Sequence, residues 1–506
     1  MLSLSLPGDL DAFDPRYVIS SPSILAIKMV FEGLMCTGPD GKITPAIAES
    51  LEISEDQKFY TFHLRPCQWS NGDEITAFDF EYTWKTLLDP NLNTKGKHNF
   101  YAIKNAEAIV HGKLPLSALG VKVIDPKTLV VELEHPAPYF LEIVASSSFF
   151  PVNSRIDRES PDWAKNAGEQ FVCNGPFLLS KHKQEDEMIF IKNPDYWDAE
   201  HVQLPGIKIC IIKDATTMLS MFEKNELDWA GKPLSRLPLD AIPHLREKGE
   251  INQFPCAGLE WYVFNVHAFP FNNKKMRQAF TYAIDRQAIA DHVLKEGETP
   301  ALGILPPSLA TQTQPFFTDN NLTLARKLFD EALEELGLEK KDLPVIKFNF
   351  SNSRLISQKV TEALQQQWKE AFGILVKLDQ REAKVHFDTL AKGDFQIGGA
   401  GWVSWLRDPI YIMQTFRFAS DSVNFPKWED PEYQRLLDAT DQELDPIKRK
   451  QFFNEAEKIL MDEFPVAPLY YMTMAYAVNK QLKNVYLSEL FEVDFRWAYF
   501  EEESQN

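Results

Sequence analysis

Strand-like and helix-like periodicities alternate along this chain, and that alternation limits the fold more than any other feature. Residues 58–65 alternate with the period of a strand, and residues 77–88 carry the pattern of an amphipathic helix. Two alternating runs around an Asp-Pro turn predict a hairpin over 121–133. Farther along, 345–350 is typical of a strand and 360–372 of a helix. Mixed elements throughout predict an α/β protein built from several lobes.

Residues 270–286 predict a turn followed by an amphipathic helix. Asn272 or Asn273 can cap the helix, because an asparagine side-chain oxygen accepts from the unbonded amides of a first turn. Apolar side chains recur at helical spacing and give the helix one face for packing. They are Met276, Phe280, Ala283 and Ile284. A helix that packs on a core is the simplest interpretation of this element.

The charge balance excludes some partners. The chain has 506 residues, with 53 lysines and arginines against 73 acidic residues, which gives a net charge of −20. So acidic a chain is a poor binder of nucleic acids and anionic membranes, and we predict no nucleic-acid partner. The acidic residues are spread along the chain, which is typical of a solubility property rather than of a binding site.

No run of about 18 apolar residues occurs, so we expect no membrane-spanning segment. Residues 1–9 alternate like an edge strand. They lack both the basic and the long apolar stretch of a signal peptide. On the residues alone, the chain is either cytoplasmic or a mature form whose signal has been removed.

The sequence lacks the common catalytic and metal-binding motifs. It contains no Gly-x-Ser-x-Gly, His-Glu-x-x-His, P-loop or Gly-x-Gly-x-x-Gly pattern, and its glycine cluster at 398–401 leads into Trp402 rather than into a phosphate-binding helix. The five cysteines have no Cys-x-x-Cys spacing, and the ten histidines are scattered. We therefore predict no enzyme, catalytic residue, metal site or cofactor, with a hydrolase built on scattered carboxylates as the alternative.

A series of short motifs occurs in order along almost the whole chain. The motifs are Phe31-Glu32-Gly33-Leu34, residues 41–48, 62–65, Trp69-Ser70-Asn71-Gly72-Asp73, 77–80, 173–177, Asn193-Pro194-Asp195-Tyr196-Trp197, 222–228, 270–286, Gly401-Trp402 and Asp408-Pro409. Each motif is weak alone, and the ordered set is specific. The set resembles the extracytoplasmic solute-binding proteins of peptide ABC transporters, the oligopeptide- and dipeptide-binding proteins of family 5.

The resemblance implies a bilobed fold of the periplasmic-binding-protein class, with an extra inserted domain and a ligand cleft that closes by hinge motion. The first lobe would be discontinuous and comprise 1–42, 170–255 and 480–506. A small domain would be inserted at 43–169, and the second lobe would cover 256–479.

The Gly-Trp motif implies where the ligand lies. In relatives that bind peptides, an aspartate three residues after the tryptophan pairs with the ligand's α-ammonium, and here that position is Trp405. Asp408 is a substitute after a local shift, or else a cap before Pro409. Trp402 and Trp405 are candidates for the pocket wall because indole faces stack on flat or cationic groups, and either is alternatively a core residue.

Other candidate contacts follow from the ligand's two ends and its backbone. A carboxylate prefers an arginine fork, and Arg354, Arg381 and Arg407 are candidates, although each alone is more often a surface residue. The segment around Glu32 can pair with an extended peptide by strand addition. His386 lies near the cleft segment in the sequence, but a lone histidine is usually structural.

The predicted function is capture of oligopeptides for a membrane ABC permease by a monomeric, periplasmic or extracytoplasmic protein, with or without a lipid anchor. Because Trp405 replaces the expected aspartate, a non-standard ligand on the same fold is the alternative. Cell-wall peptides, glutathione, a metal chelate or haem, and oligosaccharides belong to that class. A chaperone-like or interaction role is a third option, which an enclosed aromatic pocket would argue against.

Overall fold

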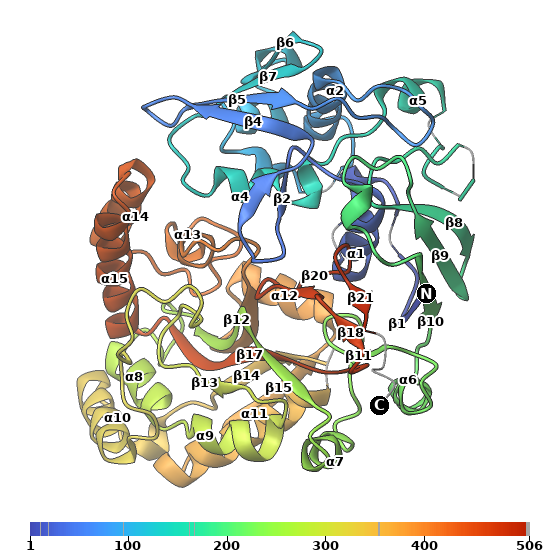
Figure 1. The fold of residues 1–506 in the computed structure, drawn as a ribbon. Coiled ribbons are helices and arrows are strands. Elements are labelled where there is room, and N and C mark those ends of the chain that lie inside the picture. Colours follow the sequence, from blue (N-terminus) through green and yellow to red (C-terminus); the bar gives the residue numbers. More distant parts are fainter. Residues whose placement is uncertain are drawn as a thin grey trace. The chain divides into compact units, whose positions relative to one another are not determined.

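The computed structural model describes residues 1–501, except residues 11, 19, 95, 161, 166, 169, 353 and 354. Arg354, one of the predicted site residues, therefore lies outside the described residues. The chain forms two compact units (Figure 1). Unit 1 comprises Met1–Asn252 and Ala475–Asn506, and unit 2 comprises Gln253–Met474. The chain passes between them twice, once in each of two long strands, β12 (Asn252–Phe264) and β17 (Val466–Val478).

Unit 1 contains a four-stranded sheet that includes the N-terminus. Its order is β1 (Leu2–Leu6), β10 (Gly206–Ile211), β9 (Glu187–Lys192) and β8 (Phe177–Lys183), and only the β1–β10 pair is parallel. Leu2, Leu4 and Leu6 are fully buried, because alternate residues of a strand share one face. The expectation of an edge strand at the N-terminus is confirmed.

The second sheet of unit 1 is antiparallel throughout, and its order is β4 (Ala48–Ile53), β5 (Phe59–Leu64), β7 (Thr128–Glu132) and β6 (Val121–Asp125). Helix α2 (Ala77–Leu88) packs against β6 and buries Phe80 and Trp84. The α2 helix begins where the Asp79 carboxylate accepts a hydrogen bond from the Thr76 amide at 3.0 Å. The strand, helix and hairpin predicted for this region are therefore confirmed.

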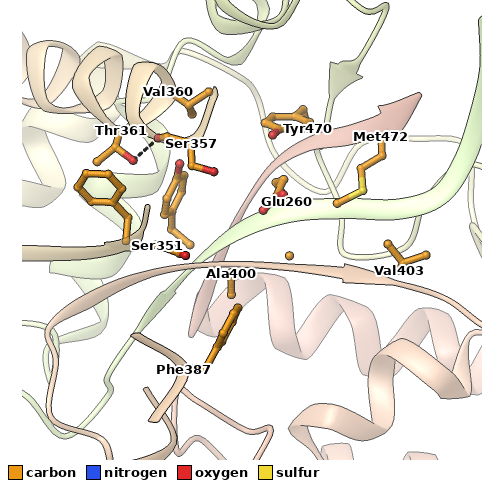
Figure 2. A pocket seen from close by; sticks show the side chains of 14 residues that line it. Glu260, Ser351, Ser357, Val360, Thr361, Phe387, Ala400, Val403, Tyr470 and Met472 are labelled. Atoms are coloured by element: carbon orange, nitrogen blue, oxygen red, sulfur yellow. Dashed lines mark hydrogen bonds between the residues drawn. The ribbon is translucent and has the colours of Figure 1, made fainter. Parts of the chain in front are cut away.

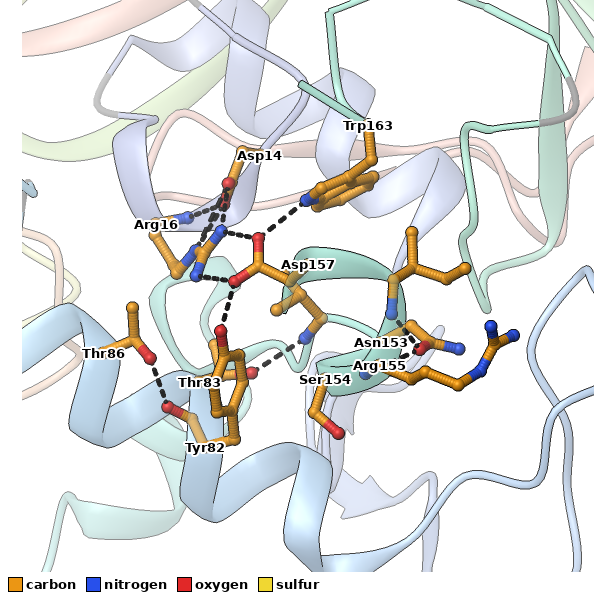
Figure 3. Close-up of polar contacts among 12 residues, drawn as sticks. Asp14, Arg16, Tyr82, Thr83, Thr86, Asn153, Ser154, Arg155, Asp157 and Trp163 are labelled. Atoms are coloured by element: carbon orange, nitrogen blue, oxygen red, sulfur yellow. Dashed lines mark hydrogen bonds and ion pairs between the residues drawn. The ribbon is translucent and has the colours of Figure 1, made fainter. Parts of the chain in front are cut away.

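An ion-pair network ties the N-terminal segment to α2 and α5 (Ser154–Glu159) within unit 1 (Figure 3). Arg16 lies 2.6 Å from Asp14 and 2.6 Å from Asp157. Asp157 also accepts from the Tyr82 hydroxyl at 2.7 Å and from the Trp163 indole at 2.9 Å. These contacts join residues on both sides of the predicted boundary between 1–42 and 43–169, and the separate inserted domain stays a prediction.

The remaining elements of unit 1 are short. The strand β11 (Trp229–Gly231) lies near the end of the segment Met1–Asn252 and pairs with the last residues of β17. The helices are α1 (Ser21–Val30), α3 (Ala106–Val110), α4 (Phe140–Val144), α6 (Ala215–Glu223) and α7 (Ile242–Glu247); the two-residue and three-residue strands are β2 (Met35–Thr37), β3 (Ile43–Pro45), β18 (Leu482–Lys483), β19 (Tyr486–Leu487), β20 (Val493–Asp494) and β21 (Tyr499–Phe500).

Unit 2 is organised around a mixed sheet. The strand order is β17, β12, β16 (Ile397–Val403), β14 (Lys347–Ser351) and β15 (Lys377–Arg381), and β13 (Thr299–Pro300) pairs with β17. β16 runs antiparallel to β12, whereas β14 is parallel to both β15 and β16. The strand predicted at 345–350 is β14, which begins two residues later and ends one residue later than predicted.

Helices cover this sheet, and their apolar sides form a large core. Phe280, Trp368, Phe348 and Leu469 are fully buried there. The helices are α8 (Lys274–Tyr282), α9 (Arg286–Ile289), α10 (Leu322–Leu336), α11 (Leu355–Phe372), α12 (Ala383–Lys392), α13 (Ile410–Met413), α14 (Pro431–Gln442) and α15 (Pro446–Glu463). None of the helices in the described residues has the length and apolar character needed to cross a bilayer.

Helix α8 bears out the prediction from 270–286. Asn273 caps it by accepting from the Met276 amide at 3.1 Å, and Met276 and Phe280 are fully buried. The helix is shorter than predicted and ends at Tyr282. Asp285 then caps α9 by accepting from the Ala288 amide at 2.9 Å, which interrupts the helix although Ile284 is still buried.

Candidate ligand-binding site

Two neighbouring strands of unit 2, β12 and β16, present different side chains on their two faces. Glu260 lies directly opposite Gly401, and Tyr262 lies opposite Gly399. Because opposed residues of an antiparallel ladder share a face, these residues form one face of the pair. The alternate residues, including Trp402, form the other face. The same strand pair therefore has a glycine-lined face and an aromatic face.

The glycine-lined face is hollowed into a pocket of about 200 Å³ (Figure 2). Glycines in a strand often mark a place where another backbone or a ligand approaches closely. A Cβ added to Gly401 would lie only 2.5 Å from Glu260 Oε2, so the carboxylate lies over this residue. The other main lining side chains are Phe350, Val360, Phe387, Val403, Tyr470 and Met472, with the hydroxyls of Ser351, Ser357 and Thr361.

The outer edge of β16 lies beside this pocket. β14 pairs with β16 only at Ile397 and Gly398. Successive residues of an antiparallel strand direct their backbone groups to opposite sides. The Ser404 amide donates to the carbonyl oxygen of Ala257 in β12 at 2.7 Å, so the backbone groups of Ser404 face β12. By alternation, Gly401 and Val403 direct their backbone groups away from β12. These two residues offer an edge to which an extended chain can add.

His386 of α12 fixes the start of that edge. Its Nε2 lies 2.7 Å from the Gly399 carbonyl oxygen, and the side chain is fully buried. Burial lowers the pKa of His386, which favours the neutral ring with Nε2–H as the donor. The expectation that this histidine is structural matches the geometry, because the ring holds β16 in place.

Trp402 packs on the aromatic face. Its ring stacks on Trp261 with a centroid distance of 6.2 Å and an interplanar angle of 19°, and it lies 6.1 Å from Tyr411. The indole N–H groups of Trp402 and Trp261 are buried and have no hydrogen-bond partner among the described residues. Trp402 thus points away from the glycine-lined pocket, and a ligand contact by its side chain stays a prediction.

Trp405 and Asp408 follow β16 and differ in their surroundings. Trp405 is 41% exposed, which suits a residue that contacts a ligand. Asp408 is buried, and its two oxygens lie 2.5 and 3.0 Å from the guanidinium nitrogens of Arg449. Asp408 also accepts from the Ile410 amide at the start of α13. This geometry corresponds to the alternative role, a structural cap, so we leave Asp408 out of the proposed site.

The two arginine candidates that the structure describes, Arg381 and Arg407, both interact with other residues of the protein. Arg381 lies 2.8 Å from Asp379 and donates to the Thr389 hydroxyl at 2.6 Å. In the parallel ladder Arg381 is opposite Ser351, which lines the pocket. Arg407 is half-buried in the loop between Trp405 and Asp408. Arg381 is therefore near the pocket rim, and both arginines stay predicted contacts.

Glu32 lies in the interior of unit 1 and is fully buried. Its carboxylate pairs with Arg496 and accepts from the Tyr196 hydroxyl at 2.9 Å and from the Trp197 indole. Burial raises the pKa of Tyr196 well above its ordinary value, so the hydroxyl stays protonated and donates.

The backbone around Glu32 is occupied as well. The Glu32 amide donates to Asn174 Oδ1, and Asn174 Nδ2 donates back to the Glu32 carbonyl, both at 3.0 Å. The Gly33 carbonyl accepts from Ile47. These three backbone groups therefore bond within unit 1, and strand addition of a peptide to this segment stays a prediction.

Comparison with known proteins identifies the family. The profile of the bacterial extracellular solute-binding proteins, family 5 Middle, matches residues 42–424. The chain belongs to this family of solute-binding proteins. It is 38% identical over 504 residues to the oligopeptide-binding protein OppA of Bacillus subtilis, covering 99% of this chain and 92% of that protein. The family resemblance and the α/β fold class predicted from the sequence are confirmed.

Solved structures of family 5 proteins are also similar over the whole chain. The Escherichia coli murein tripeptide-binding protein MppA matches with a TM-score of 0.80 at 26% identity, covering 99% of this chain and 98% of that one. The Haemophilus influenzae OppA complex with the peptide RPPGFSPFR matches with a TM-score of 0.80 at 26% identity, covering 99% of each chain.

Sequence reasoning missed two parts of the candidate pocket, Glu260 and the face opened by Gly399 and Gly401. The signal was the alternation of Gly399, Gly401 and Val403 within a strand, which opens one face. In the sequence, the glycine cluster is considered as a phosphate loop and Gly401 as part of the Gly-Trp motif, but neither indicates an open face of a strand. Glu260 carries no such signal, because its importance comes from lying opposite Gly401.

Proposed function

We propose that this chain is the substrate-binding component of an ABC importer, which captures oligopeptides and delivers them to a membrane permease. The observation that carries the proposal is the outer edge of β16 beside a pocket. An extended peptide can add to Gly401 and Val403 as a further strand. Its alternate side chains then point to opposite faces, so that one of them enters the pocket.

The relatives support a peptide rather than the other ligands considered. The Bacillus subtilis relative is an oligopeptide-binding protein, and the Haemophilus influenzae relative was solved with a peptide. In the described residues the pocket has apolar walls, hydroxyls and one carboxylate, which suit a peptide side chain better than a haem or a metal chelate.

Several finer points belong to the same proposal. The protein acts outside the cytoplasmic membrane, as a monomer, and presents its loaded form to the permease. Trp405 covers the end of the bound peptide in place of the aspartate that the resemblance implied, so the ligand's amino group is recognised differently or not at all. Its exposure beside β16 supports this role.

Native mass spectrometry of the purified protein, with fragmentation of any released ligand, tests the proposal. We expect a ladder of short peptides, or uptake of peptides after incubation with a peptide mixture. Release of a single non-peptide compound, with no peptide uptake after it is removed, would contradict the proposal. It would move the function to another solute class on the same fold.

A further inference from the structure

We propose that the pocket beside β16 selects a basic side chain of the bound peptide, with Glu260 as the group that recognises the positive charge. The inference rests on the proposed peptide-binding function and adds a side-chain preference to it. Glu260 is the one charged side chain among the lining residues, all of which lie in the described part of the chain.

The position of Glu260 follows from the ladder. It lies opposite Gly401, the residue whose backbone groups point to the outer edge. A Cβ on Gly401 would lie 2.5 Å from Oε2 and 3.0 Å from Oε1 of Glu260. Both carboxylate oxygens therefore occupy the space that a side chain would fill at any other residue type. If a peptide pairs with the edge at Gly401, one of its side chains can reach this carboxylate.

The pocket walls match the two parts of a lysine or arginine side chain. Val403 and Met472 are apolar and line the same pocket as Glu260 (Figure 2), and they can pack against an aliphatic stem. The carboxylate can then accept charge-assisted hydrogen bonds from the terminal ammonium or guanidinium. The hydroxyls of Ser351, Ser357 and Thr361 supply further polar contacts in the pocket.

The same chemistry disfavours other side chains. A neutral apolar side chain would remove water from the carboxylate and would add no charge-assisted hydrogen bond to it, which is unfavourable. An acidic side chain would be repelled by Glu260. The net charge of −20 acts in the same direction, because it attracts cationic ligands over a longer range.

Glu260 already takes part in an interaction within the protein, so the ligand's cation adds to that contact or exchanges with it. A purely internal role for Glu260 is thus the competing explanation. The two are distinguishable, because an internal role predicts equal effects on all peptides. Recognition of a cation predicts an effect on basic peptides only.

The test uses pentapeptides of alanine with lysine at one position, each compared with the same peptide carrying norleucine there. Isothermal titration calorimetry gives the dissociation constants for the wild type, Glu260→Gln and a control, Glu334→Gln. Glu334 is exposed on α10 and does not line the pocket, so its substitution removes the same net charge elsewhere. Circular dichroism checks that each variant is folded.

For one position of the pentapeptide, we expect the wild type and Glu334→Gln to bind the lysine peptide about tenfold more tightly than the norleucine peptide, as for a charge-assisted contact. In Glu260→Gln this preference disappears, while the norleucine peptide binds within about twofold of wild type. Equal weakening of both peptides, or peptide binding without any lysine preference in the wild type, would overturn the inference alone. Failure of every peptide to bind would overturn the proposed function with it.

Discussion

Glu32 in unit 1 and Glu260 in unit 2 are both carboxylates next to aromatic and apolar side chains, but their surroundings differ. Glu32 is fully buried and bonds to Arg496, Tyr196 and Trp197. Glu260 is half-buried and lines a pocket opposite a glycine. The first carboxylate holds distant parts of one unit together, whereas the second lies where a ligand can approach.

The difference shows how to separate structural from ligand-facing acids in this protein. A structural acid has its oxygens bonded to buried donors of the same unit, as Glu32 and Asp408 do. Glu260 also interacts within the protein, but it lies beside a glycine in the pocket where we propose that the ligand enters. The following variants test this distinction, from the largest expected effect to the smallest.

Glu32→Gln should be strongly destabilising, because it leaves the buried Arg496 guanidinium without its closest anion. Removing one partner of a buried ion pair costs roughly 3–5 kcal/mol. The free energy of unfolding from urea titration measures the loss, and Glu260→Gln and Glu334→Gln provide the comparison. A loss below about 1 kcal/mol would mean that Glu32 is not a structural acid.

A third carboxylate, Glu457 of α15, is buried, and no cation among the described residues pairs with it. It accepts from the amides of Ile304 and Leu305 at 2.8 and 3.1 Å, and from the Thr311 hydroxyl. Burial raises the pKa of Glu457 to about 7, although these hydrogen bonds oppose the shift.

The sign of the effect of Glu457 on stability follows from that shift. Below the unfolded pKa of about 4.5 the group is protonated in both states, and its ionisation above that value is easier in the unfolded chain. Stability is therefore lost as the pH rises from about 4.5 to 7. The unfolding free energy of the wild type, relative to Glu457→Gln, should fall by about 2–3 kcal/mol between pH 5 and pH 8. A constant difference would contradict the raised pKa.

Gly401→Ala should weaken peptide binding by about tenfold or more, or about 1.4 kcal/mol. The added Cβ would meet the Glu260 carboxylate at 2.5 Å and narrow the pocket next to the edge of β16. Gly8→Ala is the matched control, because no atom lies within 4 Å of a Cβ added there. Calorimetric binding of one pentapeptide to both variants measures the effect, and equal affinities would argue against a ligand at Gly401.

Trp405→Asp should have the smallest effect on stability, because Trp405 is 41% exposed. We expect it to improve binding of peptides with a free α-amine by severalfold, since a partly exposed ion pair contributes up to about 1 kcal/mol. The matched ligand is the same peptide with an acetylated amine, whose affinity should not improve. No gain for the free amine would mean that Trp405 does not face the peptide terminus.

Much of the fold was predictable because it follows from local periodicity. The strand at 58–65, the helix at 77–88 and the hairpin at 121–133 correspond to β5, α2 and the β6–β7 pair. Boundaries were less accurate, because the first turns of α11 (Leu355–Phe372) precede the apolar stripe from which the helix was predicted.

The site was less predictable because it depends on contacts between residues far apart in the sequence. Nothing near Glu32 indicates Arg496, and nothing near Asp408 indicates Arg449. Alternation along β16 shows that Gly401 and Trp402 lie on opposite faces. It does not show which face is open, since that depends on the pairing with β12 and on the divergence of β14.

Amide hydrogen exchange along β16, with and without a bound pentapeptide, tests the central claim most directly. If a peptide adds to the outer edge, exchange at Gly401 and Val403 should slow by at least about tenfold. The amides of Ala400 and Trp402 already face β12 and should not change, so they serve as internal controls. Peptide binding by calorimetry with unchanged exchange at Gly401 and Val403 would contradict the claim and move the ligand to another surface.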